Sequence, residues 1–253
     1  MVAGAASKRS WAVQQSAATR RQLILAAMRL MAEKGLEGVS LRSVNAAAGA
    51  RNSSAAHYHF GNKLGLFSAV VEMFEQDVAA ARKPLIEKLR IRSATEKLSA
   101  REIIEAAYGP FMGLLFHPEY GLPGLKFLSR LIVDSGPEVR LLANKFTGPL
   151  ANEVLELLTQ ALPDLPPKVL KIRILFSLIN LINGMSDVVA LKMSPFGDMS
   201  PPDLLEAANY FIEYITAGIS ASPSSMTDSF ITESGELIRR FRESGQEIDP
   251  SGA

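Results

Sequence analysis

Four consecutive polar residues, Arg51-Asn52-Ser53-Ser54, followed by His57, could recognise the edges of DNA bases. An Arg guanidinium can pair with guanine through two hydrogen bonds, an Asn amide can pair with adenine, and a Ser hydroxyl can contact a base or a phosphate. Arg51 is therefore a candidate for guanine, Asn52 for adenine, and Ser53 or Ser54 for either kind of contact. The sequence leaves open which of these side chains makes which contact.

Neighbouring residues could hold the phosphate backbone of the same DNA. Arg42 and Lys63 flank the polar group and are candidates for phosphate contacts, with Tyr58 and His59 as backbone donors or packing groups. Each residue also has an ordinary interpretation, because polar helix faces are usually solvated and a Tyr beside a Phe often fills a core. The interpretation as a DNA-binding surface depends on their combination.

Charge supports that combination, because it is distributed unevenly along the chain. Residues 1–63 contain nine Lys and Arg against Glu33 and Glu37, a formal charge of +7. The other 190 residues contain 18 Lys and Arg against 24 Asp and Glu, or −6, so the total of +1 conceals a basic head on an acidic body. This asymmetry is expected when one end of a protein meets phosphates.

Three helical segments must position these side chains. The first is predicted to begin with Thr19 as its N-cap and to stop at Gly35, burying one apolar face that contains Leu23, Ile24, Ala27, Leu30 and Met31. Ser40 is predicted to cap a short second helix, Gly49 to supply a sharp turn, and residues 52–59 to form a third helix with a polar outer face. This arrangement is typical of a helix-turn-helix unit.

The rest of the chain shows helical periodicity interrupted by Pro and Gly, with no convincing alternation of strand type, so the predicted fold is all-α. Further helices are expected at residues 64–89, 100–116, 123–134, 137–161, 167–193 and 201–220. The predicted domains are a flexible arm at 1–18, a DNA-binding domain at 19–63, a helical effector-binding and dimerisation domain at 64–222, and a polar tail at 223–253. The tail contains one short helix candidate, Asp228 to Arg242.

Composition argues against catalytic and metal chemistry. The chain has no Cys and only three His, and it has neither a phosphate-binding glycine loop nor a Ser nucleophile elbow. We therefore expect no enzyme activity, no metal and no cofactor. The most apolar segment, Ile172 to Met193, contains Arg173, Asp187 and Lys192, and the N-terminus has no apolar signal region, so we expect no membrane partner and a cytoplasmic location.

The last two predicted helices of the body, 167–193 and 201–220, have broad apolar faces. They could form a four-helix bundle with the same helices of a second copy, or they could be buried within one chain. An effector cavity would lie among the body helices. Its candidate lining residues are Met112, Leu115, Phe116, Phe127, Leu131, Phe176 and Asn180.

Ordinary core packing is the alternative for each of these candidates, and Asn180 and Asn183 could bond to each other or to a second copy. No charged anchor stands out among them, which favours an apolar or weakly polar effector.

About fifty residues within the segment 19–67 closely resemble the tetracycline-repressor (TetR) family of bacterial transcriptional regulators. The motifs that carry the resemblance are Ile24-x-x-Ala27, Glu33-Lys34-Gly35, Ser40-Leu41, Ala48-Gly49, Tyr58-His59-Phe60-Gly61-Asn62-Lys63 and Leu66. The resemblance implies a homodimer that binds a two-fold DNA operator, usually as a repressor, and releases it when a small molecule enters the body. Two other classes remain as alternatives: a helical protein-interaction adaptor, and an all-α enzyme without a recognisable catalytic motif.

The sequence departs from the family pattern at two positions and in one spacing. Asn45 stands where the family usually has a small apolar residue, and Ala50 where it usually has Val, which predicts looser or different packing between the second and third helices. The segment from Gly49 to Phe60 is also one residue longer than the commonest pattern, which shifts the base-contact assignments within residues 51–57 by up to one position.

Overall fold

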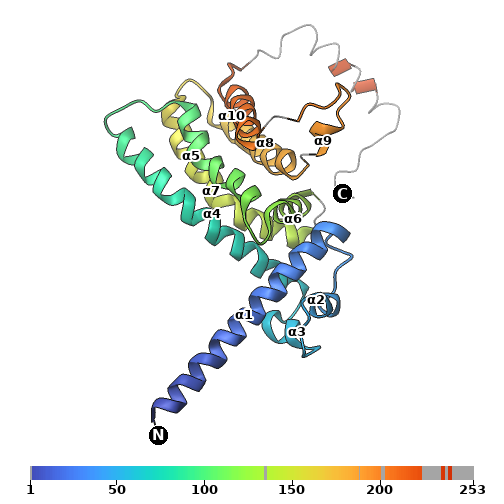
Figure 1. Cartoon of the computed structure of the whole chain (residues 1–253). Coiled ribbons are helices and arrows are strands. Elements are labelled where there is room, and N and C mark those ends of the chain that lie inside the picture. Colours follow the sequence, from blue (N-terminus) through green and yellow to red (C-terminus); the bar gives the residue numbers. More distant parts are fainter. Residues whose placement is uncertain are drawn as a thin grey trace. The chain divides into compact units, whose positions relative to one another are not determined.

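A computed structural model describes residues 2–133, 136–187, 189–200, 203–223, 235–236 and 239–240. Contacts divide the chain into two compact units, residues 1–220 and 221–253. The described part of the first unit consists of α-helices joined by short turns, with no β-strand, so the predicted all-α fold is confirmed (Figure 1).

The head is formed by three helices and the start of a fourth: α1 (Val2–Lys34), α2 (Leu41–Ala47), α3 (Ala55–Phe60) and α4 (Lys63–Ser93). The predicted apolar face of α1 is buried, except that Leu30 is half-buried. Leu66, Val70 and Phe74 in the first turns of α4 are fully buried. Since α4 continues without a break into the body, a single helix connects the two regions (Figure 1).

The body contains the remaining described helices of the first unit. They are α5 (Ala100–Gly113) with a 3₁₀ turn (Leu114–Phe116), α6 (Gly121–Val133), α7 (Pro137–Ala161), α8 (Pro167–Ser186), α9 (Val189–Lys192) and α10 (Leu204–Ser220). Helix α4 packs against α5 and α7, α6 packs against both α1 and α8, and α10 packs against α5 and α8. A Cβ atom at Gly124 would lie 2.7 Å from the Phe74 ring, so α6 approaches α4 closely only because this residue is glycine.

Three predicted boundaries are wrong. Helix α1 begins at Val2 and not at Thr19, so residues 2–18 are helical where an irregular arm was expected. The Thr19 hydroxyl caps nothing and donates to the Gln15 carbonyl 3.0 Å away inside the helix. This segment contains six Ala and no Pro, so local propensity extends the helix although its described side chains bury nothing.

The other two corrections concern the third helix and the segment 167–193. The third helix starts at Ala55, three residues later than predicted, and the long apolar segment is divided at Asp187 into α8 and α9. The helix candidate Asp228 to Arg242 lies largely outside the described residues.

Helix α8 is the one helix in the described part of the chain that is long and apolar enough to cross a membrane, judged by length and composition alone. Its mean hydropathy is 1.4. The core helix of a soluble protein can pass the same test, and α8 packs against α6, α7 and α10.

Candidate functional site

Helix α2 is held at both ends by the residues that its sequence predicts. The Ser43 N–H donates to the Ser40 hydroxyl at 3.1 Å, and the Ser40 N–H donates to the Ser43 hydroxyl at 3.0 Å. This reciprocal capping box satisfies two N–H groups that have no partner within the helix. Beyond the other end, Gly49 has a φ of 61°, which is a left-handed conformation that favours glycine.

Asn45 joins α2 to α3. Its side chain is 5% exposed, its amide nitrogen donates to the Ser53 carbonyl at 2.5 Å, and its amide oxygen accepts from the Ala56 N–H at 2.8 Å. The Ala56 N–H is one of the first-turn donors of α3, which lack a partner within the helix. The departure at position 45 therefore adds one hydrogen bond to α3 and one to the turn before it, so that of the two alternatives, looser or different packing, the structure has a different arrangement at this position.

The turn between α3 and α4 is equally constrained. Gly61 has a φ of 72°, and the Asn62 side chain caps α4 by accepting from the Gly65 N–H at 2.8 Å. A Cβ atom at Gly65 would lie 2.1 Å from the Phe60 carbonyl oxygen, a distance that no side chain tolerates. The orientation of α3 is thus fixed from both sides, by Asn45 before it and by this turn after it.

The candidate base-reading residues lie immediately before this supported helix. Arg51, Asn52, Ser53 and Ser54 are all exposed, but they lie in the turn that precedes α3 and not at the start of the helix as predicted. The Asn52 side-chain oxygen accepts from the Ser54 N–H at 2.9 Å, which shapes the turn.

Helix α3 itself presents two further candidates to solvent, His57 and Tyr58. Tyr58 is 81% exposed, so within this chain it is not a packing group. The buried side of the same helix is formed by Ala55 and Ala56. In Figure 1, α2 and α3 lie at the end of α4 that is farther from α5 and α10.

The candidates for phosphate contact differ in how available they are. Arg42 is exposed on α2. The Lys63 ammonium instead lies 3.3 Å from both the carboxylate and the carbonyl oxygen of Glu37, so a phosphate would have to compete with this ion pair. Burial, followed by the charge of Arg20, lowers the pKa of the half-buried His59, which favours its neutral form at neutral pH.

Arginines of α1 connect the head to the body, a role that the sequence did not indicate. Arg21 forms an ion pair with the Glu119 carboxylate, which holds the pKa of Glu119 below its usual range, and Arg29 donates to the Glu119 carbonyl at 3.2 Å. The adjacent Tyr120 donates to Asp77 of α4 at 2.5 Å. Part of the head's positive charge is therefore neutralised within the molecule.

The predicted effector residues are dispersed. Phe127 and Leu131 are fully buried and Met112 is 6% exposed, while Leu115 is half-buried and Phe116 is 62% exposed. Phe176 and Asn180 both line one pocket of about 370 Å³ between α8 and α10. The other residues of this pocket are Arg173, Ser177, Tyr214, Ile215, Ala217, Gly218 and Ile219.

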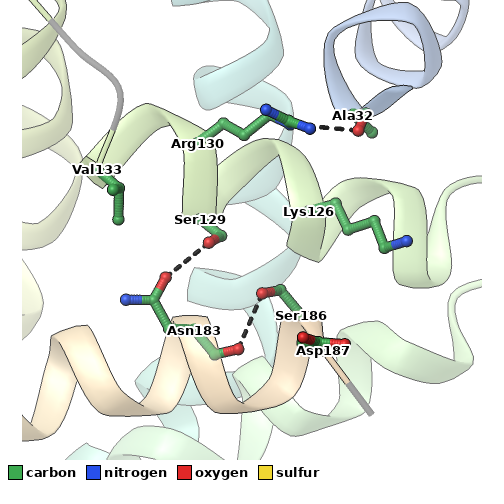
Figure 2. Close-up of a pocket in the computed structure, with 8 residues that line it drawn as sticks. All are labelled: Ala32, Lys126, Ser129, Arg130, Val133, Asn183, Ser186 and Asp187. Carbon is green, nitrogen blue, oxygen red and sulfur yellow. Dashed lines mark hydrogen bonds between the residues drawn. The ribbon is translucent and has the colours of Figure 1, made fainter. Parts of the chain in front are cut away.

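The two asparagines of α8 do not bond to each other. Asn180 donates to the Phe176 carbonyl at 2.9 Å, and Asn183 accepts from the Ser129 hydroxyl at 2.6 Å. Asn183 belongs to a larger pocket of about 550 Å³, in which residues of α1, α6 and α8 meet (Figure 2). Sequence reasoning missed this pocket, although Lys126 and Arg130 lie four residues apart and therefore on one face of α6.

Metal binding finds no support in the part of the chain that the structure describes. No group of three or more His, Cys, Asp or Glu side chains there could hold a metal ion.

Tyr108 and Ser177, which form a buried hydrogen bond of 2.6 Å between α5 and α8, act as a structural pair.

The head and body together define a helix-turn-helix transcriptional regulator. Residues 23–70 match the family model described as bacterial regulatory proteins, tetR family. Residues 101–218 match the model described as tetracyclin repressor-like, C-terminal domain. The chain therefore belongs to the TetR family of ligand-responsive transcriptional regulators, as the sequence motifs predicted.

Solved structures share the fold at low sequence identity. A TetR-family transcriptional regulator from Rhodococcus sp. aligns with a TM-score of 0.56 and 16% identity over 80% of this chain and 99% of its own. The fatty acid degradation regulator FadR from Bacillus halodurans gives 0.53 and 16% over 81% and 97%. FadR from Bacillus subtilis, solved in complex with stearoyl-CoA, gives 0.52 and 17% over 79% and 98%. Comparison with curated proteins gives no match.

The Asn45 bridge yields a stability prediction. We expect Asn45→Ala to lower the free energy of unfolding by about 1–3 kcal/mol, because the buried Ala56 N–H loses its partner. Chemical denaturation monitored by circular dichroism measures this loss. Asn152→Ala, at an exposed position on α7, is the matched control and should change stability by less than about 0.5 kcal/mol. Equal stability of the two variants would refute the role assigned to Asn45.

Proposed function

We propose that this chain represses transcription by binding a two-fold DNA operator as a homodimer, and that a small effector bound in the body releases the operator. The observation that carries the proposal is the supported recognition element. The turn before α3 and the outer face of α3 are exposed and polar, while Asn45 and the Gly65 turn fix the helix from behind. A side-chain set of this kind suits base edges in the major groove.

Charge supports the proposed contact with DNA. Lys63, Arg20 and Arg21 have acidic partners within the molecule, whereas no ion pair involves Arg42 or Arg51 in the described part of the chain. Arg42 and Arg51 therefore need not give up an ion pair to bind phosphate or a base. We assign Arg42 to phosphate and Arg51 to base recognition, with Asn52, Ser53, Ser54 and His57 beside it.

A two-fold operator requires two heads about 34–36 Å apart, so the proposal requires a dimer. Helices α8 and α10 expose large apolar side chains, and the contact of such a surface with water is unfavourable in a single chain. These residues are Ile172, Leu175, Phe176, Leu205, Tyr210 and Tyr214, between 43% and 77% exposed. We propose that the same surface of a second copy covers them.

The effector is proposed to bind in the pocket between α8 and α10. Phe176, Ile215 and Ile219 supply apolar contacts there, and Asn180 supplies a polar group, which suits an apolar or weakly polar molecule. The FadR complex with stearoyl-CoA supports a ligand-binding role for a body of this fold. A ligand could change operator affinity only by binding the two states of the dimer with different affinity.

Within this proposal the protein acts in the cytoplasm, where its DNA lies, and has no catalytic activity of its own. Its partners are double-stranded DNA, a small effector and a second copy of the chain. A helical adaptor would share the fold but would not need an exposed recognition element.

The DNA-binding proposal predicts two kinds of arginine variant. Arg51→Ala should reduce the preference for an operator over random duplex by about 1–3 kcal/mol, because base contacts carry sequence discrimination. Arg42→Ala should weaken binding to all duplexes alike and lower the salt slope by about one per subunit, because phosphate contacts release counterions. Fluorescence anisotropy at several salt concentrations, with operator DNA selected from a random pool, measures both effects.

Arg140→Ala, at an exposed site on α7, is the matched control and should leave preference and slope unchanged. Duplex binding that ignores salt, or the same effect from both head variants, would favour the adaptor.

The dimer proposal predicts that a charge on the α8–α10 surface separates the subunits. Leu175→Glu, whose side chain is 56% exposed in one chain, should sediment at the monomer mass of 27.4 kDa, because the dimer would bury the new carboxylate. Ile91→Glu, at a 67% exposed apolar position on α4, should remain dimeric. Analytical ultracentrifugation checks both variants, and a monomeric wild-type protein would refute the dimer.

A further inference from the structure

The larger pocket lies where the head meets the body. Its volume is about 550 Å³, and α1 contributes Ala32, while α6 and α8 form its walls (Figure 2). It shares no residue with the pocket between α8 and α10. None of the residues nominated for the effector from the sequence lines it.

Most residues that line this pocket have polar or charged side chains. Lys126 and Arg130 of α6 supply two positive charges, and Asp187 supplies one negative charge. Ser129, Asn183 and Ser186 add hydrogen-bonding groups, and they are partly ordered by the bond from Ser129 to Asn183 and the bond of 2.9 Å from the Ser186 hydroxyl to the Asn183 carbonyl. The ammonium of Lys126 and the guanidinium of Arg130 suit a carboxylate or phosphate group, and the volume lies within the range of organic ligand pockets and not of a single inorganic ion.

Arg130 connects the pocket directly to the head. Its Nε donates to the Ala32 carbonyl at 3.2 Å (Figure 2). A Cβ atom at Gly35 would lie 3.5 Å from its Nη1. Ala32 is in the last turn of α1, where carbonyls lack partners within the helix and the helix dipole is negative. The guanidinium therefore stabilises the end of α1 immediately before the Gly35 turn that leads to α2.

We propose that this pocket binds a small organic anion, through a carboxylate or a phosphate group held by Lys126 and Arg130. The bound anion competes with the Ala32 carbonyl for the Arg130 guanidinium, so that binding loosens the end of α1 and lowers operator affinity. The regulatory half of this inference rests on the proposed function, whereas the binding half does not. The anion site is distinct from the apolar site between α8 and α10.

Binding is tested on the full-length protein without DNA. Isothermal titration calorimetry with succinate and with glycerol 3-phosphate, against sodium chloride at matched ionic strength, should show saturable binding of at least one probe. The probe that binds identifies the group as carboxylate or phosphate. Failure of both probes to saturate, or heats equal to those of sodium chloride, would overturn the site.

Variants locate the site. Lys126→Gln should weaken binding about tenfold or more, because it removes a charge-assisted bond from an exposed position. Arg130→Lys should also weaken binding while keeping the positive charge beside α1. Lys145→Gln, exposed on α7, and Asn180→Ala, in the other pocket, are controls that should bind the probe like the wild type. Unchanged binding by Lys126→Gln, or loss of binding in Asn180→Ala, would place the probe elsewhere and refute the assignment.

Coupling is tested by adding the saturating probe to the protein on operator DNA. We expect the probe to lower the operator affinity of the wild type at least threefold. The same probe concentration should lower the operator affinity of Lys126→Gln by a smaller factor. An operator that binds well but does not respond to a bound probe would overturn the regulatory half alone. A protein that binds the probe but no operator would refute the proposed function and leave the anion site standing.

Discussion

The amide of Asn45 is the contact on which the recognition surface depends. One polar side chain, buried between α2 and α3, satisfies a carbonyl before α3 and an N–H within its first turn. Such a pair has a defined geometry, whereas an apolar contact of the same size would tolerate sliding. Because α3 is only six residues long, it could not hold its own orientation, and the neighbouring elements have to impose it.

The basic residues of the head serve two purposes: some contact groups of the protein itself, and the others remain available to a nucleic acid. The head is strongly basic in sequence, yet Arg21 and Arg29 contact Glu119, and Lys63 contacts Glu37. These contacts hold α1 against the body and close the turn beside α4. The charge available to a nucleic acid is therefore smaller than composition suggests, and it includes Arg42 on α2 and Arg51 in the turn that precedes α3.

Much of the fold could be predicted from the periodicity of apolar residues and from the Ser, Gly and Pro residues that start or end helices. Ser40, Gly49 and the prolines at the start of α7 and α8 mark boundaries through local chemistry, and the apolar face of α1 follows from its spacing. The extension of α1 to Val2 was missed because this alanine-rich segment has no apolar stripe in its sequence to indicate a helix. The role of Asn45 and the junction pocket were missed because partners such as Ser53 with Asn45, or Ala32 with Arg130, become neighbours only when the chain folds.

The continuity of α1 has a mechanical consequence. About 19 residues separate Val2 from Arg21, the point where Glu119 holds the helix, and at 1.5 Å per residue this is an arm of roughly 29 Å. A rotation of about 10° about that point would move the tip of the arm by about 5 Å, because displacement grows with distance from the pivot. Small displacements of the body against α1 are thus amplified into large ones at the far end of the same helix.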